Sequence, residues 1–210
     1  MPTNRRVISL GFSAHPIQEG RHICFLFNDD GERLDVIDRF LASGLQQKEK
    51  VICLVDTMGP DAFVEQLRAY GVAPTEAGLV VAEASAAYCP SGHFSADDVL
   101  QFVRTFYDAA RMAGYEGARG TGEMGWSLDG GYGDMTELMS YEARLNDVLD
   151  VSPITLCCQY DVRRFDGQSI LDVLSVHPIA IVHGQVVQNP YYVDPAVFLE
   201  KLNHRRAAHV

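Results

Sequence analysis

Residues 119–126, Arg119-Gly120-Thr121-Gly122-Glu123-Met124-Gly125-Trp126, have the pattern of a short buried strand that ends in a glycine-rich turn. The turn carries a carboxylate, that of Glu123, and the only tryptophan of the chain. A second strand-like run, Ile154-Thr155-Leu156-Cys157-Cys158, ends in the same way, in Gln159-Tyr160-Asp161. Ligands of open parallel sheets bind beyond the carboxyl ends of the strands. These two strand ends therefore predict a small polar pocket above a sheet.

The rest of the chain alternates between apolar runs of strand length and helical patterns. In the helical segments, apolar residues recur at three- and four-residue spacing, as at Leu34, Ile37 and Leu41. The apolar runs, which predict strands, lie at residues 22–27, 51–55, 78–82, 154–158 and 179–182, and a further, glycine-rich strand is expected at residues 117–123. Strands that are apolar throughout and alternate with helices indicate a mainly parallel sheet covered on both faces. We expect a three-layer α/β domain with an antiparallel hairpin near the C-terminus, at His183-Gly184-Gln185.

The chain shows no convincing linker between domains. We expect a leader at residues 1–21, one α/β domain at residues 22–190 and a C-terminal helix at residues 191–210. No apolar segment of signal-peptide type follows the polar N-terminus, and no run approaches 18 consecutive apolar residues. The five cysteines are an odd number, and four of them lie in apolar runs. These features predict a cytoplasmic protein with reduced cysteines.

The composition restricts the classes of partner. Hydrophobic residues make up 47% of the 210 residues, which is enough for a core and argues against disorder. The net charge of −11 offers no basic footprint for nucleic acid and repels anionic lipid headgroups. We therefore expect no direct nucleic-acid or membrane partner, and small-molecule or protein partners instead.

The first strand-to-helix turn, Asn28-Asp29-Asp30-Gly31-Glu32-Arg33, does not fit a phosphate loop. Such a loop needs several glycines and a lysine followed by a hydroxyl residue. This turn has one glycine, no lysine and three acids, which repel phosphate. Asn28 and Asp29 have a simpler alternative role as caps of the following helix.

Metal and nucleophile patterns are weak. Cys89 and His93 have the spacing of a metal-binding pair, but a partner pair is missing. Cys157 and Cys158 are adjacent on a strand and point to opposite faces, so they are poorly placed to share a metal. We predict no metal site and cannot assign a cofactor.

Catalytic pairs are equally uncertain from the sequence. Cys24 with His22 as its base would share one strand face, but a buried structural pair is the favoured interpretation. Glu123 and Asp161 are a candidate acid–base pair whose separation the sequence does not define.

The candidate ligand-binding residues lie at strand ends or on the first strand. They are His22, Cys24, Asn28, Glu123, Trp126, Gln159, Tyr160 and Asp161. Several have a structural alternative: Trp126 as ordinary core, and Gln159 and Asp161 as partners of loop amides. For Glu123, the alternative is a structural bridge to one of three arginines, namely Arg119, Arg163 or Arg164.

Several ordered blocks resemble the MEDS family, the methanogen/methylotroph DcmR-type sensory domain, over roughly residues 20–182. The blocks are His22-Ile23-Cys24-Phe25-Leu26-Phe27-Asn28 with Glu32-Arg33-Leu34, Gly44-Leu45 with Glu49-Lys50-Val51, Gly92-His93-Phe94, Gly122-Glu123-Met124-Gly125-Trp126, Tyr141-Glu142-Ala143-Arg144-Leu145-Asn146, Cys158-Gln159-Tyr160-Asp161 with Arg163-Arg164-Phe165, and Asp172-Val173-Leu174 with His177-Pro178. The resemblance implies a RecA- and KaiC-like α/β domain without the phosphate loop. It also implies a sensory role for small organic molecules, beside a histidine kinase or a DNA-binding domain.

The leading hypothesis is a stand-alone, non-catalytic sensory domain for signal transduction and transcription regulation. Because 210 residues leave no room for a kinase or a DNA-binding module, we expect output through a separate kinase or transcription regulator, or through a homodimer. Glu123 and Gln159 would orient the ligand, while Trp126 and Tyr160 would form apolar walls. Binding would shift the loop at residues 130–133.

Two alternatives from other classes stay open. One is an interaction module that regulates a kinase or an anti-sigma system without a ligand. Its docking or dimer face would be the last helix, with Phe198, Leu199 and Leu202, although packing of this helix on the sheet is the simpler interpretation. The other is a degenerate nucleotide-dependent or hydrolytic enzyme that uses Glu123 and Asp161.

Overall fold

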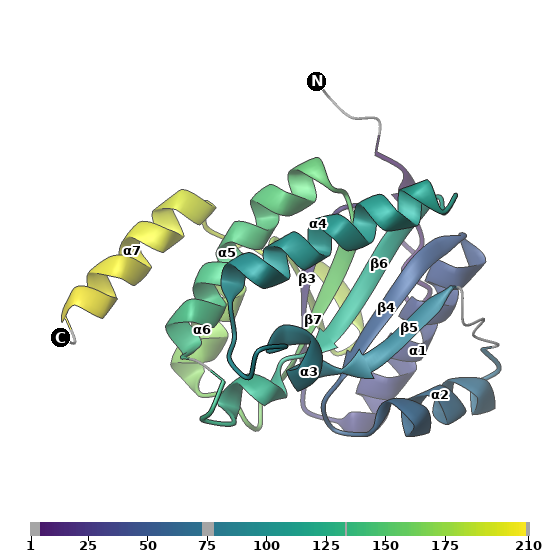
Figure 1. Cartoon of the computed structure of the whole chain (residues 1–210), viewed down its shortest axis with the longest axis horizontal. Coiled ribbons are helices and arrows are strands. Elements are labelled where there is room, and N and C mark those ends of the chain that lie inside the picture. Colours follow the sequence, from purple (N-terminus) through teal and green to yellow (C-terminus); the bar gives the residue numbers. More distant parts are fainter. Residues whose placement is uncertain (1–4, 73–77, 133, 209–210) are drawn as a thin grey trace.

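Seven strands form one sheet at the centre of the molecule (Figure 1). The computed structural model describes residues 5–72, 78–132 and 134–208. The sheet order is β5-β4-β6-β7-β3-β8-β9, and only the β8–β9 pair is antiparallel. The strands are β3 (His22–Phe27), β4 (Glu49–Val55), β5 (Leu79–Glu83), β6 (Gly117–Glu123), β7 (Thr155–Asp161), β8 (Ile179–Val182) and β9 (Gln185–Gln188). The predicted fold class is therefore confirmed, including the late hairpin.

Helices cover both faces of this sheet, as predicted. The α1 face is covered by α1 (Asp30–Gln46) and α2 (Pro60–Ala69). The opposite face, here the α4 face, is covered by α3 (Ala84–Tyr88), α4 (Ala96–Met112), α5 (Met135–Val151) and α6 (Gly167–Val176). A short 3-10 helix, η1 (Gly125–Leu128), follows β6, and α7 (Pro195–Ala208) packs on α5 and α6 (Figure 1).

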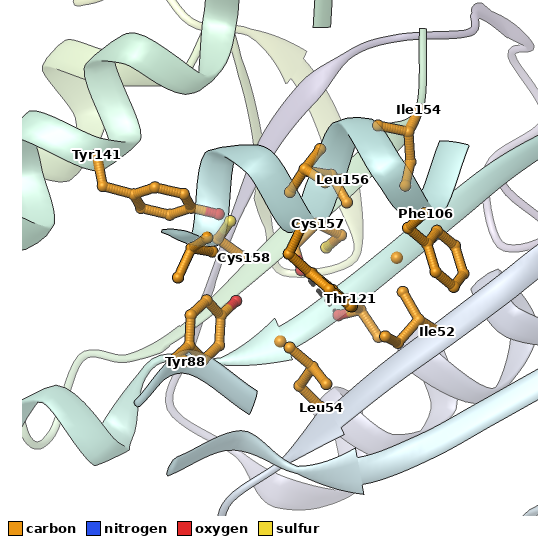
Figure 2. A pocket seen from close by; sticks show the side chains of 15 residues that line it. Ile52, Leu54, Tyr88, Phe106, Thr121, Tyr141, Ile154, Leu156, Cys157 and Cys158 are labelled. Carbon is orange, nitrogen blue, oxygen red and sulfur yellow. Dashed lines mark hydrogen bonds between the residues drawn. The ribbon is translucent and has the colours of Figure 1, made fainter. Parts of the chain in front are cut away.

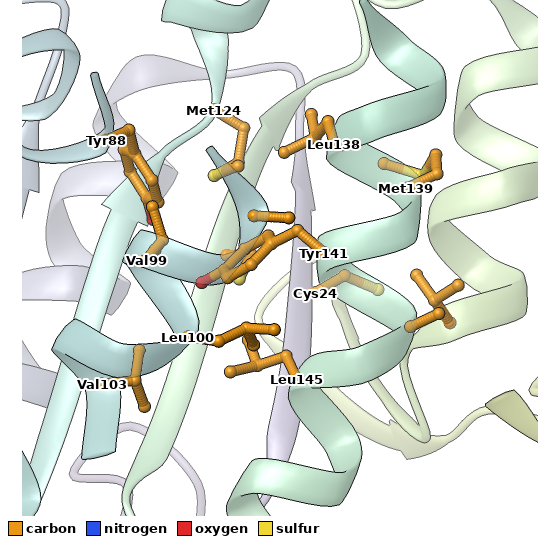
Figure 3. Packing of buried hydrophobic residues seen from close by; sticks show 14 of the residues in the cluster. Cys24, Tyr88, Val99, Leu100, Val103, Met124, Leu138, Met139, Tyr141 and Leu145 are labelled. Carbon is orange, nitrogen blue, oxygen red and sulfur yellow. The ribbon is translucent and has the colours of Figure 1, made fainter. Parts of the chain in front are cut away.

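Strand residues alternate between the two faces, because successive side chains of a strand point to opposite sides. In β3, Ile23 and Phe25 are buried in the core of the α1 face, whereas Cys24 is buried in the core of the α4 face. Figure 3 shows side chains of α4 and α5, among them Leu100 and Leu145, pointing into the α4-face core. Because both faces are covered, central strands such as β3 bury apolar side chains on both faces.

Side chains of two aspartates and a serine cap the N-termini of three helices. The side chains of Asp29, Ser95 and Asp134 each accept a hydrogen bond from the backbone N–H three residues later. Asp29 is thus the N-cap of α1, and Asn28 lies exposed just before it. The alternative role of Asp29 as a cap is what the structure shows.

The N-terminal segment packs against the domain. It contains β1 (Val7–Ile8) paired with β2 (Ile17–Gln18), and the Leu10 side chain is fully buried in the core of the α1 face. At the other end of the chain, Phe198 and Leu202 of α7 are buried against α5 and α6 rather than on the sheet. No helix within the described ranges is long and apolar enough to cross a membrane.

A buried arginine joins β6 to α1 and to the N-terminal segment. Arg119 has no exposed surface and donates from Nε to the Glu49 carboxylate. Its other two nitrogens donate to the carbonyls of Phe40 (2.7 Å) and Ser9 (3.1 Å). Arg6 approaches the other oxygen of Glu49 at 2.7 Å, so one buried carboxylate serves two guanidinium groups. Burial lowers the pKa of Arg119, and Glu49 opposes that effect.

This arginine explains a glycine in the last turn of α1. A Cβ atom at Gly44 would lie 2.6 Å from Cδ and 2.7 Å from Nε of Arg119. Alanine is the better helix former by about 1 kcal/mol in a helix interior. We nevertheless expect Gly44→Ala to lower the free energy of unfolding by about 1–3 kcal/mol, because the clash displaces Arg119. Urea unfolding monitored by circular dichroism measures this.

The matched control is Gly167→Ala at the start of α6. A Cβ atom there meets nothing within 4 Å, so that substitution should be neutral or stabilising. Equal effects of the two substitutions would contradict the role assigned to Gly44.

Candidate functional site

Strand β6 presents glycines to one face and polar side chains to the other. Gly120 and Gly122 point toward the α4 face, because they alternate with Arg119, Thr121 and Glu123. A Cβ atom at Gly120 would lie 2.8 Å from Cγ2 of Ile52, and one at Gly122 would lie 2.5 Å from the Tyr88 hydroxyl. The missing side chains let Ile52, Leu156 and Tyr88 pack directly against the backbone of the strand.

An apolar cavity of about 40 Å³ lies over these glycines, between β4, β6 and β7 and helix α4 (Figure 2). This volume is small, so the space suits a molecule of few non-hydrogen atoms. In Figure 2, the hydroxyl ends of Tyr88 and Tyr141 point toward Cys158 at one end of the cavity. The lining residues are Ile52, Leu54, Tyr88, Val99, Phe102, Val103, Phe106, Gly120, Thr121, Gly122, Tyr141, Ile154, Leu156, Cys157 and Cys158.

Glu123 lies on the opposite side of the sheet, in a buried ion pair. One of its oxygens lies 2.6 Å from Nη1 of Arg33, and the other accepts the backbone N–H of Thr57 at 2.9 Å. Arg33 also donates to the Thr57 hydroxyl at 3.1 Å, and Gln159 donates to the Thr121 hydroxyl at 2.9 Å. Glu123 and Gln159 are thus engaged by protein groups.

The bridge from Glu123 therefore goes to an arginine of α1, and not to Arg119, Arg163 or Arg164 as the alternative interpretation expected. Arg119 binds Glu49, Arg163 binds Asp161 and Asp30, and Arg164 lies 3.5 Å from Asp56. All three arginines that were candidate partners of Glu123 therefore pair with other carboxylates.

Asp161 is held by the turn that follows β7. Its Oδ1 accepts the backbone N–H of Arg163 at 2.9 Å and the Nε of the same residue at 2.8 Å. The hydrogen bonds from Arg163 lower the pKa of Asp161, against a smaller effect of burial. The alternative role as partner of a loop amide is what the structure shows for this residue.

Trp126 lies in the aromatic part of the α4-face core. Its ring stacks on Tyr88 at a centroid distance of 4.9 Å and contacts Phe94 at 5.3 Å. Tyr132, from the loop predicted to move, meets the indole edge-on at 6.3 Å. Only 2% of Trp126 is exposed, and its indole N–H has no hydrogen-bond partner among the described residues. Position 133 of that loop lies outside the described residues.

His22 joins a buried polar cluster on the α4 face. Its Nε2 lies 2.9 Å from Oε2 of Glu142, and the Tyr160 hydroxyl donates to Oε1 of Glu142 at 2.6 Å. Cys158 Sγ lies 3.6 Å from the same nitrogen of His22. Burial alone would raise the pKa of Glu142, but the hydrogen bond from His22 and the charges of the two nearby histidines lower it. Burial raises the pKa of the Cys158 thiol, and Glu142 adds to that rise.

A further member of this cluster is His177, which was not among the predicted site residues. It follows α6, and its Nε2 lies 3.6 Å from Oε2 of Glu142. Its pKa is lowered to about 3 by burial and by the neighbouring His22. Glu142 was not among the predicted site residues either, because a carboxylate in the middle of a helix is usually exposed on the surface.

Comparison with known families agrees with the blocks noted in the sequence. The family model of MEDS, described as the methanogen/methylotroph DcmR sensory domain, matches residues 21–178. The chain belongs to the MEDS family. The transcriptional repressor DcmR of Methylorubrum extorquens is 26% identical over 157 residues, which are 74% of this chain. This MEDS chain spans 57% of the length of that relative.

Solved structures of other proteins have a fold similar to that of this MEDS domain. The KaiC-like protein PH0186 of Pyrococcus horikoshii OT3 has a TM-score of 0.58 and 10% identity, covering 84% of this chain and 79% of that one. The flagellar accessory protein FlaH of Methanocaldococcus jannaschii has a TM-score of 0.58 and 11% identity, covering 87% and 84%. The fold is therefore KaiC-like, while the turn before α1 lacks the glycines and lysine of a phosphate loop.

The MEDS domain does not bring its predicted ligand residues into one pocket. The sheet separates Glu123 and Gln159 on the α1 face from the residues on the α4 face. Those α4-face residues are His22, Cys24, Trp126 and Tyr160. Cys24 is not paired with His22, since its thiol faces the carbonyl of Ile179 at 3.7 Å.

Proposed function

We propose that this MEDS domain is a sensory module whose cavity over Gly120 and Gly122 binds a small, neutral organic molecule. The observation that carries the proposal is this cavity, placed where the central strand has no side chains. The family is a sensory one, and a relative is named a transcriptional repressor. We further propose that the output goes to a transcription regulator in the cytoplasm.

The lining of the cavity limits the chemistry of its ligand. The side chains that line the cavity from this face are aliphatic or aromatic, including two tyrosines, apart from Cys158, and none of those described is charged. The other two polar lining residues, Thr121 and Cys157, point their side chains to the α1 face. A charged ligand would lose its hydration without compensation in such a site. A few apolar atoms with at most one weak polar group, directed at Tyr88 or Tyr141, fit best.

The aromatic contacts offer a route from the cavity to the surface. Tyr88 lines the cavity and stacks on Trp126, and Trp126 in turn meets Tyr132. Tyr132 also accepts the backbone N–H of Phe94 at 2.6 Å, which connects the loop to the segment before α4. A ligand that binds better to one arrangement of Tyr88 would shift this loop between its states.

Methyl NMR on the full chain tests the proposal with methanol, ethanol, 1-propanol and 1-butanol as probes. We expect saturable shifts at the methyl groups of Ile52, Leu54 and Leu156 for the short alcohols, with affinity falling as the chain lengthens. Linear shifts spread over surface methyl groups for every alcohol would contradict a specific site.

Filling the cavity provides the matched test. Val103→Ile adds one methyl group to a residue that lines the cavity, whereas Val148→Ile adds the same group to the same core outside it. One methylene changes binding in an apolar pocket by about 10–200-fold, so Val103→Ile should weaken alcohol binding by at least the lower figure. Val148→Ile should leave the titration unchanged. Equal titrations of both variants would place the binding elsewhere.

The structure gives no specific support to the two alternatives. The apolar side chains Phe198 and Leu202, which a docking helix would have to present, are buried within the domain. Glu123 and Asp161, the suggested acid–base pair, are each bound by their own arginine. We therefore propose a non-catalytic role.

A further inference from the structure

Four potential metal ligands converge at one point in the core of the α4 face. His22 comes from β3, Glu142 from α5, Cys158 from β7 and His177 from the end of α6. Their ligand atoms all lie within 4.8 Å of one another. Each of the four residues is at most 4% exposed. This cluster does not depend on the ligand cavity proposed above, although Cys158 touches both.

The distances in the cluster are close to those around a tetrahedral ion. Oε2 of Glu142 lies 2.9 Å from Nε2 of His22, 3.6 Å from Nε2 of His177 and 3.8 Å from Sγ of Cys158. Sγ of Cys158 lies 3.6 Å from Nε2 of His22. Bonds of about 2.0–2.3 Å at tetrahedral angles separate neighbouring ligand atoms by roughly 3.3–3.7 Å. Ligand atoms that lie up to 4.8 Å apart would have to move closer by as much as about 1 Å to bind the ion.

His177 is oriented as a metal ligand. Its Nδ1 lies 2.7 Å from the carbonyl of Val173, which accepts the proton of that nitrogen and leaves the lone pair on Nε2. That Nε2 is buried, faces the cluster and has no hydrogen-bond partner among the described residues. The Tyr160 hydroxyl holds the other oxygen of Glu142 at 2.6 Å, which orients the carboxylate. Such outer hydrogen bonds are typical of ligands in metal sites.

The charges of the cluster balance around a divalent ion. A thiolate and a carboxylate carry two negative charges, and two neutral imidazoles carry none. A divalent cation makes the sum zero, which a fully buried site requires. Cysteine sulfur, imidazole nitrogen and carboxylate oxygen together are ligands that zinc accepts in four-coordinate sites.

We propose that His22, Glu142, Cys158 and His177 form a closed, four-coordinate site for a divalent transition-metal ion, best suited to Zn²⁺. All four positions are filled by protein, as in structural rather than catalytic zinc sites. The ion would connect β3, β7, α5 and the end of α6. On binding, Zn²⁺ would form bonds to Cys158 sulfur and to Nε2 of His22, while the thiol proton leaves to solvent and the proton of the His22 ring moves from Nε2 to Nδ1. Because the site is buried, loading occurs as the chain folds.

Cobalt is the probe for the test. The full chain is unfolded with chelator present, freed of chelator and refolded with one equivalent of Co²⁺. We expect one Co²⁺ per chain, the intense visible bands of tetrahedral cobalt and a thiolate-to-cobalt charge-transfer band in the near ultraviolet. Refolded protein that takes up no Co²⁺, or shows only octahedral bands, would overturn the proposal.

Two cysteines close to Cys158 provide matched controls. Cys158→Ser should abolish the charge-transfer band, whereas Cys157→Ala, on the opposite face, and Cys24→Ala, on the same face, should retain it. A band that survives in Cys158→Ser would assign the metal to other residues.

If Cys158→Ser does not fold, X-ray absorption of the zinc-loaded wild-type protein tests whether a cysteine sulfur binds the ion. One sulfur at about 2.3 Å among four ligands supports the site, and none or two exclude it.

Discussion

Glu123→Gln should lower the free energy of unfolding by about 3–5 kcal/mol, because it breaks a buried ion pair and leaves one charge behind. Arg33 is 4% exposed and would lose the carboxylate that lies 2.6 Å from its Nη1. Glutamine has one oxygen and one NH2 group in place of the two carboxylate oxygens. The oxygen can accept either from Thr57 or from Arg33, so one of these two contacts is lost in either orientation. Urea unfolding of the two proteins measures the loss.

A double-mutant cycle separates the lost pair from other effects of the substitution. Arg33→Met together with Glu123→Gln removes both charges and keeps an acceptor for Thr57. It should therefore cost clearly less than the sum of the two single substitutions. Glu65→Gln, at a 70%-exposed side chain paired with Arg68, is the surface control and should change stability by less than about 0.5 kcal/mol.

The Glu123→Gln variant also distinguishes a structural role of Glu123 from the ligand-binding role that the sequence suggested. A structural Glu123 predicts large destabilisation with unchanged alcohol titrations at Ile52 and Leu156, measured where the variant is still folded. Unchanged stability with lost alcohol binding would instead restore Glu123 as a ligand group.

The fold could be predicted because its signals are local. Apolar runs such as residues 22–27, bounded by polar turns, mark strands that are buried on both faces. The caps at Ser95 and Asp134 are visible as a serine or an aspartate three residues before an acid. These patterns depend only on neighbours in the chain, so the sequence contains them in full.

The site could be predicted only in part, because its geometry depends on which face a residue points to. Glu123 and Gln159 are partners in the register of β6 and β7, so both point to the α1 face. Trp126, three residues beyond Glu123, lies in η1 and turns to the α4 face. Strand ends alone do not reveal this division, because one residue of displacement exchanges the faces.

The buried cluster was out of reach for a different reason. Glu142 and His177 both lie in blocks that carry the family resemblance, yet Glu142 is 120 residues away from His22 in the chain. Only the packing of α5 and the end of α6 against β3 and β7 brings these side chains together. A carboxylate amid the apolar stripe of α5, next to Tyr141, was the available signal.

Arg119→Met should have an effect as large as the loss of Glu123, lowering the free energy of unfolding by about 3–5 kcal/mol. Methionine preserves much of the apolar stem but removes one donor from each of the carbonyls of Phe40 and Ser9. The Ser9 carbonyl keeps the Ser43 hydroxyl and the Gln47 amide as donors. It also leaves Glu49 with Arg6 as its remaining charged partner. Arg119→Lys should recover only part of the loss, because one ammonium cannot replace a fork that serves a carboxylate and two carbonyls.

The region in which hydrogen exchange accelerates in Arg119→Met shows which contacts Arg119 provides. Because Arg119 holds the carbonyl of Ser9, hydrogen exchange in Arg119→Met should accelerate first in β1 and β2 and in the last turns of α1. Arg39→Met is the control, since that side chain is 47% exposed, pairs with Asp35 on the surface of α1 and should change stability by less than about 0.5 kcal/mol. If exchange instead rises uniformly, or Arg119→Met is as mild as Arg39→Met, the N-terminal segment is held by its other contacts and not by the buried guanidinium. Those contacts include the apolar ones of Leu10 and the hydrogen bonds of Gln47 and Ser43 to Ser9.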